Sequence, residues 1–238
     1  MQATKPLILS LGVCALALTS LSTLADTPQA AKFTGPALAV GLSAGSSEIE
    51  VKNSPEMDAY LRPSSGSSYS ERSSNQGYAQ PTVDLSYGFA LNERLVGTVG
   101  LSYDFGAVDT KTAPMLTGSS EQGPAIKLTR HRSIYVAPGL RLGREWLLYG
   151  KLGYHQITAK HQWKITKNGK TSPQQSSTLS GASIGFGANW AMTRNLELRM
   201  EAEAINFNRL DDHFADGSKT YSARPSMVRS NLLLGYRF

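Results

Sequence analysis

The sequence predicts an all-β fold: a closed eight-stranded antiparallel up-and-down barrel that crosses a membrane with its strands. Three observations lead to this prediction. Apolar and polar residues alternate with period two in eight separate segments, short turns alternate with long polar loops between them, and the apolar face of the segments carries more bulk than a narrow interior can hold.

The alternation is clearest between Thr82 and Leu91. Every second residue there is large and apolar, and the residues between them are small or polar. Since successive side chains of a strand point to opposite faces, this segment has one apolar and one polar face. Seven further segments repeat the pattern, beginning near residues 37, 95, 134, 146, 182, 196 and 228. Each segment is expected to offer about ten or more alternating residues, which is enough to cross a bilayer at a steep tilt.

The connections between these segments alternate in length. Tight turns are predicted around residues 92, 144 and 194, and four long loops, rich in Ser, Gly, Pro, Asn and Lys, are predicted at about 52–79, 109–124, 164–177 and 208–225. Outer-membrane barrels have this layout, with the turns in the periplasm and the loops outside the cell. We therefore expect a barrel over residues 37–238, after a short lead at 26–36, with its sheet closed so that no strand edge is exposed.

The bulky apolar face is expected to contact lipid. A soluble barrel would put this face inside, but an eight-stranded interior is only just wide enough to be filled by side chains, so the large ones would not fit. The opposite face is small on several strands, as in Gly181, Ser183, Gly185 and Gly187, which suits a crowded interior. Aromatic residues also gather near both strand ends, as they do in the interfacial belts of membrane barrels.

The first 25 residues are predicted to be a cleaved export signal. Lys5 supplies the positive start, residues 6–18 are mostly apolar, and Thr23 and Ala25 place small side chains before the expected cleavage site. Cys14, the one cysteine in the chain, lies within this signal, and Val13 before it argues against a lipoprotein. The mature chain would then contain no thiol, no disulfide and no cysteine metal site.

The charge of the chain is modestly basic. The 24 Lys and Arg residues exceed the 18 Asp and Glu residues, so removal of Lys5 with the signal would leave 23 basic residues and a net charge of +5. This excess suits a protein that lies among anionic lipid headgroups. It gives no reason to expect nucleic acid as a partner.

The inward face is predicted to hold a network of paired charges. Its members lie on the polar faces of the later strands: Arg141, Lys151, Glu197, Arg199, Glu201, Glu203, Arg229 and Arg237. If the last loop is centred near residue 217, Glu197 lies opposite Arg237 and Glu203 lies opposite Asn231. Pairing is expected because an unpartnered buried charge costs several kcal/mol. A polar plug is the favoured interpretation, since eight strands leave little space, and a narrow charge-lined channel is the alternative.

No motif for a catalytic or metal site is found, and we expect neither enzyme activity nor a cofactor. His155 and His161 lie six strand positions apart, about 20 Å, which is too far for a shared metal. Two serines, Ser43 and Ser183, lie in Gly-x-Ser-x-Gly strings, but both strings fall inside predicted strands and not at the strand-to-helix elbow that the catalytic motif requires. Some eight-stranded barrels modify lipid A with a Ser, His and acid set near the outer rim, but Ser133 or Ser180 with His131 matches no such spacing.

A basic patch is expected where the fourth and fifth strands meet the long loops. Its members are Lys127, Arg130, His131, Arg132, Lys160, His161 and Lys164. Fixed cations at that height could bind lipopolysaccharide phosphates or sulfated host glycans. General compatibility with an anionic leaflet is the alternative explanation.

The chain ends in a phenylalanine, with apolar residues at alternate positions before it: Leu232, Leu234, Tyr236 and Phe238. Together with the paired segments 135–140 and 148–154, this ending resembles that of the small outer-membrane β-barrels of the OmpA/OmpX and opacity types. The resemblance implies that the barrel-assembly machinery reads the last strand, after transit with periplasmic chaperones.

The resemblance identifies a class of barrel and no single activity. It favours a non-enzymatic surface protein of the bacterial outer membrane, structural or adhesive, whose partners are outer-membrane lipid, lipopolysaccharide and a candidate host surface ligand. A narrow passive pore is the second hypothesis, and a barrel enzyme that modifies lipid A is the third.

Overall fold

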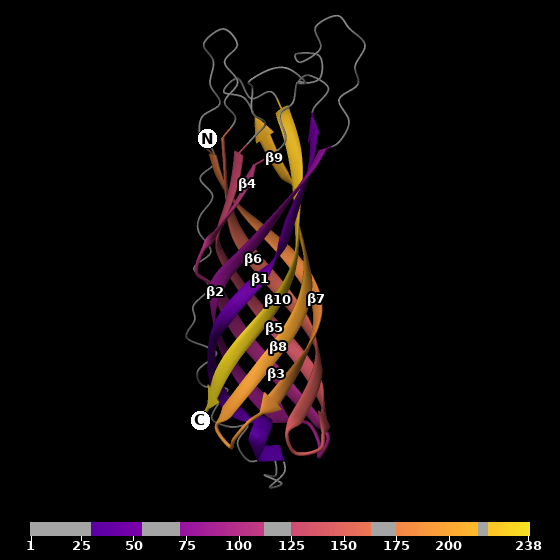
Figure 1. The fold of residues 1–238 in the computed structure, drawn as a ribbon. Coiled ribbons are helices and arrows are strands. Elements are labelled where there is room, and N and C mark those ends of the chain that lie inside the picture. The colour runs from indigo at the N-terminus through magenta and orange to yellow at the C-terminus, as the bar shows by residue number, and fades with distance from the viewer. Residues whose placement is uncertain (1–29, 54–71, 112–124, 163–174, 214–218) are drawn as a thin grey trace, which may run out of the picture.

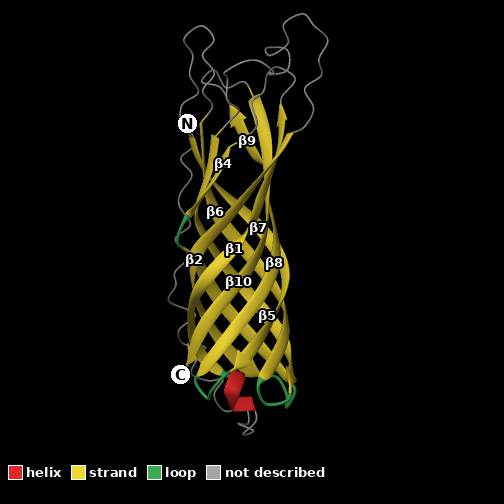
Figure 2. Cartoon of the chain, in the orientation of Figure 1, coloured by secondary structure: helices red, strands yellow, loops and turns green. Residues whose placement is uncertain are grey.

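The computed structural model describes residues 30–53, 72–111, 125–162, 175–213 and 219–238. Nearly all of these residues are in strands, and the strands wind around one closed barrel (Figures 1 and 2). The predicted signal peptide and the middle of each predicted long loop lie outside the described residues.

A short 3-10 helix, η1 (Ala30–Phe33), precedes the strands. The strands are β1 (Gly35–Asn53), β2 (Arg72–Ala90), β3 (Leu95–Asp104), β4 (Ala107–Lys111), β5 (Ala125–Leu142), β6 (Trp146–Gln162), β7 (Gln175–Ala191), β8 (Leu196–Phe207), β9 (Leu210–His213) and β10 (Lys219–Arg237). Among the described residues, no helix has both the length and the apolar character needed to cross a membrane.

The strands form one antiparallel sheet that closes on itself. Their order is β1-β2-β3-β5-β6-β7-β8-β10, and β10 pairs again with β1. β4 continues the line of β3 after a break at Phe105 and Gly106, and β9 continues that of β8 after a break at Asn208 and Arg209. The wall therefore has eight strands, and the predicted fold class is confirmed.

The strands extend further into the predicted loops than the sequence indicated. Residues 72–79, predicted as part of the first loop, pair with β1 without a break, from Val51 opposite Arg72 to Ala44 opposite Ala79. The last three residues of β4 lie within the second predicted loop, and β9 and the start of β10 lie within the fourth. These segments are Ser-rich or charged on both faces, so they have little apolar alternation by which a strand could be recognised.

The outer face is apolar around the middle and turn end of the barrel. Leu85 and Leu101 are about half exposed, at 53% and 51%, and the inward Ser86 and Ser102 next to them are buried. Small inward residues let the strands curve closely. A Cβ atom added at Gly41 would lie 2.0 Å from the carbonyl oxygen of Leu232 on β10.

The register of the last two long strands differs by two residues from the sequence prediction. Glu203 lies opposite Arg229, not Asn231, and Glu197 lies opposite Gly235, not Arg237. The predicted register assumed that the last loop is centred near residue 217. The observed centre lies one residue earlier, and each residue of that shift moves the pairing by two positions.

A β-bulge in β5 reverses the direction in which its side chains point. Arg130 has a left-handed backbone conformation, with φ of 56°. Thr129 pairs with Thr158 and Arg132 pairs with Gln156, so β5 advances three residues where β6 advances two. The added residue turns Ile126 and Leu128 inward and Lys127 outward.

Beyond the bulge, at the loop end, the sheet divides into two four-stranded groups. Over residues 72–80 β2 pairs only with β1, β4 pairs only with β5, and β9 pairs only with β10. Within the described part of the chain this leaves β2, β1, β10 and β9 on one side and β4, β5, β6 and β7 on the other (Figure 1, top).

The polarity of the two faces also reverses at the loop end. Along β1, the outward residues change from Leu42 to Glu48, and the inward residues change from Ser43 to Ile49. The inward apolar side chains from both groups pack into one cluster: Ile49, Val51, Val108, Ile126, Leu128, Ile157, Ala159, Leu179, Ile205, Phe207, Leu210, Ala223 and Met227. The interior is therefore apolar where the barrel leaves the apolar outer belt.

The turn end of the interior is closed by a second apolar cluster. Phe33 of η1 is completely buried there, with Val96, Tyr135, Ala137, Leu147, Tyr149 and Ala191. η1 lies across this end of the barrel (Figure 2, red). The carbonyl oxygen of Phe33 would lie 2.0 Å from a Cβ atom added at Gly88, so the segment fits closely against β2.

We expect Gly41→Ala to prevent closure of the barrel, because the new methyl group would overlap the backbone of β10. Gly77→Ala is the matched control, since the atom nearest to its Cβ position is 3.9 Å away. Heat-modifiability on gels after refolding measures the folded fraction. Equal folded fractions for the two variants would contradict the close approach at Gly41.

Candidate functional site

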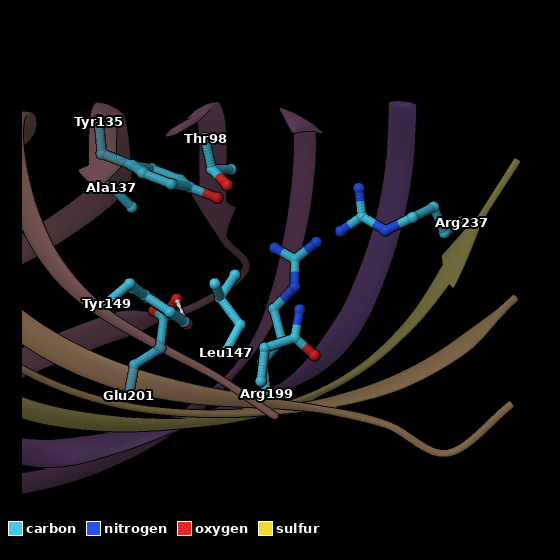
Figure 3. Close-up of a pocket in the computed structure, with 9 residues that line it drawn as sticks. Thr98, Tyr135, Ala137, Leu147, Tyr149, Arg199, Glu201 and Arg237 are labelled. Carbon is cyan, nitrogen blue, oxygen red and sulfur yellow. Dashed lines mark hydrogen bonds between the residues drawn. The ribbon is translucent and has the colours of Figure 1, made fainter. Parts of the chain in front are cut away.

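The interior between the two apolar clusters is filled by charged side chains that pair across the barrel. Towards the turn end, the guanidinium of Arg199 donates to Asp84 at 2.7 Å and to Glu197 at 2.7 Å. Arg237 donates to the other oxygen of Glu197 at 2.8 Å. Figure 3 shows Arg199 and Arg237 projecting into this space from their strands.

Lys151 occupies the middle of the interior. Its ammonium lies 2.8 Å from Glu201 and 3.6 Å from Glu203, and 4.4 Å from the centre of the Tyr135 ring. Tyr149 donates its hydroxyl to Glu201 at 2.7 Å, a bond that can be followed in Figure 3. The charge of Lys151 is therefore compensated by two carboxylates and by the face of an aromatic ring.

Arg229 connects this middle layer to the layer above it. Its guanidinium donates two bonds to Glu203, at 2.9 and 2.8 Å, and one to Asp104 at 2.7 Å. Both bonds to Glu203 go to the same carboxylate oxygen, Oε2, and the other oxygen, Oε1, accepts from Ser183. The side chain of Arg229 is among the largest of the completely buried side chains in the described residues.

Two histidines complete the network, and sequence reasoning had missed their role. His131 contacts Asp104 through Nδ1 at 2.6 Å and His155 through Nε2 at 3.0 Å. His155 contacts Ser183 at 2.8 Å and Glu203 at 3.1 Å. All of these side chains are buried.

His131 was predicted for the surface basic patch, and this prediction is wrong because the side chain is buried inside the barrel. His131 lies two and four residues before the inward Ser133 and Tyr135, so the period-two rule alone turns it inward. The polar faces of their strands had already predicted Asp84 and Asp104 as further members, and the same rule turns His155 inward.

Arg141, predicted for the same network, lies at the turn end. Its guanidinium donates to the backbone carbonyl of Glu93 at 2.9 Å. The side chain is buried, and its hydrogen bond links β5 to the turn between β2 and β3.

The interior has little free space. A cavity lined by Thr98, Tyr135, Tyr149, Arg199 and other residues (Figure 3) offers about 10 Å³ to the centre of a water-sized molecule, which is room for roughly one water. Apolar clusters lie above and below this charged layer. Within the described residues, apolar side chains therefore interrupt the polar interior on both sides of the charged layer.

The candidate catalytic groups Ser133, Ser180 and His131 are each engaged in hydrogen bonds with other side chains. Ser183 lies near His155, but its hydroxyl donates to Glu203 at 2.6 Å, and the set is buried away from any substrate. Ser133 bonds to Ser102 at 2.6 Å, whereas Ser180, on the outward face of β7, accepts from Asn208 at 2.9 Å. In the described part of the chain, no three His, Cys, Asp or Glu residues are placed to hold a metal ion.

Four members of the predicted basic patch lie on the outside of β5 and β6. Lys127, Arg130, Arg132 and Lys160 are exposed, and Lys127 lies opposite Lys160 in the register. Lys127 pairs with Asp109 at 3.4 Å, and Arg132 donates to Gln156 at 2.8 Å. Lys164 and the side chain of His161 lie outside what the structure describes.

The C-terminal residues of the predicted assembly signal all point outward. Leu232, Leu234, Tyr236 and Phe238 are between 47% and 72% exposed, and the rings of Tyr236 and Phe238 meet edge to face at 5.1 Å. At the same end of the barrel, Trp146 stacks on Trp190 at 5.8 Å. Aromatic rings therefore gather outside the turn end, at the rim of the apolar belt.

Comparison with known proteins finds a family match over most of the chain. Residues 11–238 match the family model described as the outer membrane protein beta-barrel domain. No curated protein matches the chain.

Solved structures resemble the fold. OprG from Pseudomonas aeruginosa is 12% identical, with 87% of this chain and 97% of that chain covered and a TM-score of 0.54. Ail of Yersinia pestis is 16% identical, over 86% and 99% of the two chains, with a TM-score of 0.36. OmpT from Escherichia coli is 9% identical, over 85% and 96%, with a TM-score of 0.42. At these identities the likeness concerns the fold alone, and of the three only OprG has a TM-score above 0.5.

We expect Lys151→Met to lower the free energy of unfolding by about 3–5 kcal/mol, because it leaves two buried carboxylates without their cation. Lys127→Met breaks an exposed pair and should cost at most about 1 kcal/mol. Urea unfolding in detergent micelles, followed by tryptophan fluorescence, measures both. The double variant Lys151→Met with Glu201→Gln should recover part of the loss; no recovery would mean that the two side chains act independently.

Proposed function

Because the chain belongs to the outer membrane protein beta-barrel domain family, we propose that it is a non-enzymatic cell-surface protein with a structural or adhesive role. The family places it among the outer-membrane β-barrel proteins of the Gram-negative type. The proposal adds that the chain is exported with a cleaved signal peptide and that its loop end contacts lipopolysaccharide or host components.

The filled interior is the observation that carries this proposal. Arg229, Lys151 and Arg199 pair with carboxylates across the barrel, and apolar side chains close both ends of that layer. In a barrel whose interior is filled in this way, the outer surface and the loops remain available to contact a partner. The filled interior argues against the narrow pore, and the burial of His131 and Ser133 argues against the lipid A-modifying enzyme.

The exposed basic patch supports contact with anionic sugars or phosphates. Along β5, the outward residues change from the apolar Ile134 to Arg132 and then Arg130, and Lys127 lies beyond the bulge. Three cations thus follow one another directly at the edge of the apolar belt. Lipid A phosphates lie at this height in an outer leaflet, and arginine binds phosphate with two parallel hydrogen bonds.

We expect the triple variant Lys127→Gln, Arg130→Gln, Arg132→Gln to retain lipopolysaccharide about tenfold less well than the wild type. The matched control removes the same charge on the other side of the loop end, by Lys52→Gln, Arg209→Gln and Arg224→Gln. Mass spectrometry of lipopolysaccharide that remains bound through purification in mild detergent is the measurement. Equal retention by the patch variant and the control would remove the patch from the proposal.

We also expect no stable, salt-dependent openings from the purified protein in planar bilayers, because the charged layer and both apolar clusters block the axis. Stable openings would favour the pore over the surface role. A change in lipid A mass in cells that overproduce the protein would favour the enzyme.

A further inference from the structure

The outer face of the barrel has an apolar groove near the turn end, apart from the basic patch and the interior. Its volume is about 480 Å³. The outward side chains that line it come from four neighbouring strands: Leu95, Pro138, Leu140, Leu148, Gly150 and Phe186. The groove lies within the apolar belt, so its surroundings are hydrocarbon.

The groove exists because one row of outward positions lacks bulk. Gly150 of β6 lies between Pro138 of β5 and Phe186 of β7 in the register. A Cβ atom added at Gly150 would meet no atom within 4 Å. Leu148 forms the wall on the turn side, and Phe186, which is 70% exposed, stands beside the hollow.

An acyl chain is the occupant that fits this place. Water is excluded from the apolar belt, and the side chains that line an unfilled hollow lose dispersion contacts. Lipid headgroups are held at the edge of the bilayer, so a chain in the groove belongs to a lipid whose headgroup lies at the turn end. In a family whose turns face the periplasm, that lipid is a phospholipid of the inner leaflet of this membrane.

The two turns next to the groove carry charges that match one kind of headgroup. The first turn has Glu93 and Arg94, and the second has Arg144 and Glu145; all four are exposed. Within the described residues, none of the four forms an ion pair with another side chain. Arg94 directly precedes Leu95, which lines the groove.

Opposite charges side by side suit a zwitterionic headgroup. An arginine can hold the phosphate, and the neighbouring carboxylate can accept hydrogen bonds from a primary ammonium. An anionic headgroup would lie beside the two glutamates and would carry no positive group to pair with them. A choline headgroup has no N–H group to donate.

We propose that the groove at Gly150 and the turns at Arg94 and Arg144 form a binding site for one phospholipid with an ethanolamine headgroup. Its acyl chain lies between Pro138 and Phe186, and its phosphate and ammonium contact the charges of the two turns. The site is independent of the surface contacts proposed above, since it lies at the opposite end of the barrel.

The test uses the purified full-length protein in micelles with equal amounts of ethanolamine, glycerol and choline phospholipids of matched chains. Native mass spectrometry counts the lipids that stay bound. We expect one ethanolamine lipid on the wild type, retained at least about fivefold over either competitor. Retention of all three lipids in proportion to the mixture would overturn the proposal.

Gly150→Leu tests the groove, because the added side chain fills open space and should leave the fold intact. Ala204→Leu is the matched control, an outward position of the belt on β8 away from the groove. Gly150→Leu should lose the bound lipid and Ala204→Leu should keep it, both with normal heat-modifiability. A lipid that remains on folded Gly150→Leu would overturn the assignment of its acyl chain.

The headgroup contacts are tested separately. Arg94→Gln with Arg144→Gln should reduce retention of the ethanolamine lipid, since the phosphate loses its partners. Glu93→Gln with Glu145→Gln should instead shift the preference towards the glycerol lipid, because the carboxylates that disfavour an anionic headgroup are gone. Unchanged preference in both variants would overturn the ethanolamine assignment.

Discussion

Arg229 shows the interaction on which the barrel depends. From β10 it reaches Glu203 on the neighbouring β8 and, across the interior, Asp104 on β3. Arg199 spans the same space from β8 to Asp84 on β2. Backbone pairing joins each strand only to its two neighbours, whereas the pairs Arg229–Asp104 and Arg199–Asp84 connect strands that do not pair with each other. In so narrow an interior a charge is tolerated only when its partners are in place, so the side chains must fit as a set.

Apolar side chains close the charged layer at both ends. At the loop end the strands turn apolar side chains such as Ile49 and Met227 inward, while at the turn end Phe33 of η1 closes the opening. The barrel thus has a polar interior inside the apolar belt and an apolar interior beyond it. Where hydrocarbon surrounds the barrel, the polar groups face inward. Where water surrounds the loop end, the polar groups face outward.

Much of this structure follows from period-two alternation, which is a local property. Leu85 and Leu101 were expected on the outside, Glu201 and Arg229 on the inside, and both placements agree with the structure. The errors arose where alternation was interrupted or not applied. The bulge at Arg130 exchanges the two faces of β5, and His131 was grouped with its chain neighbours on the surface although its position in the alternation is inward.

The sequence by itself determined the number of strands, their antiparallel order and the face that contacts lipid. Strand number and order depend on residues near one another in the chain, and the face follows from the total bulk of the apolar side chains, which needs no knowledge of their contacts. Only the tertiary structure decided which charges meet, as when a shift of two residues pairs Glu203 with Arg229. It also decided that the glycine at position 150 leaves a hollow where other glycines lie under a neighbouring ring or strand. Such contacts join residues from strands far apart in sequence, and their positions depend on the curvature and register of the closed sheet as a whole.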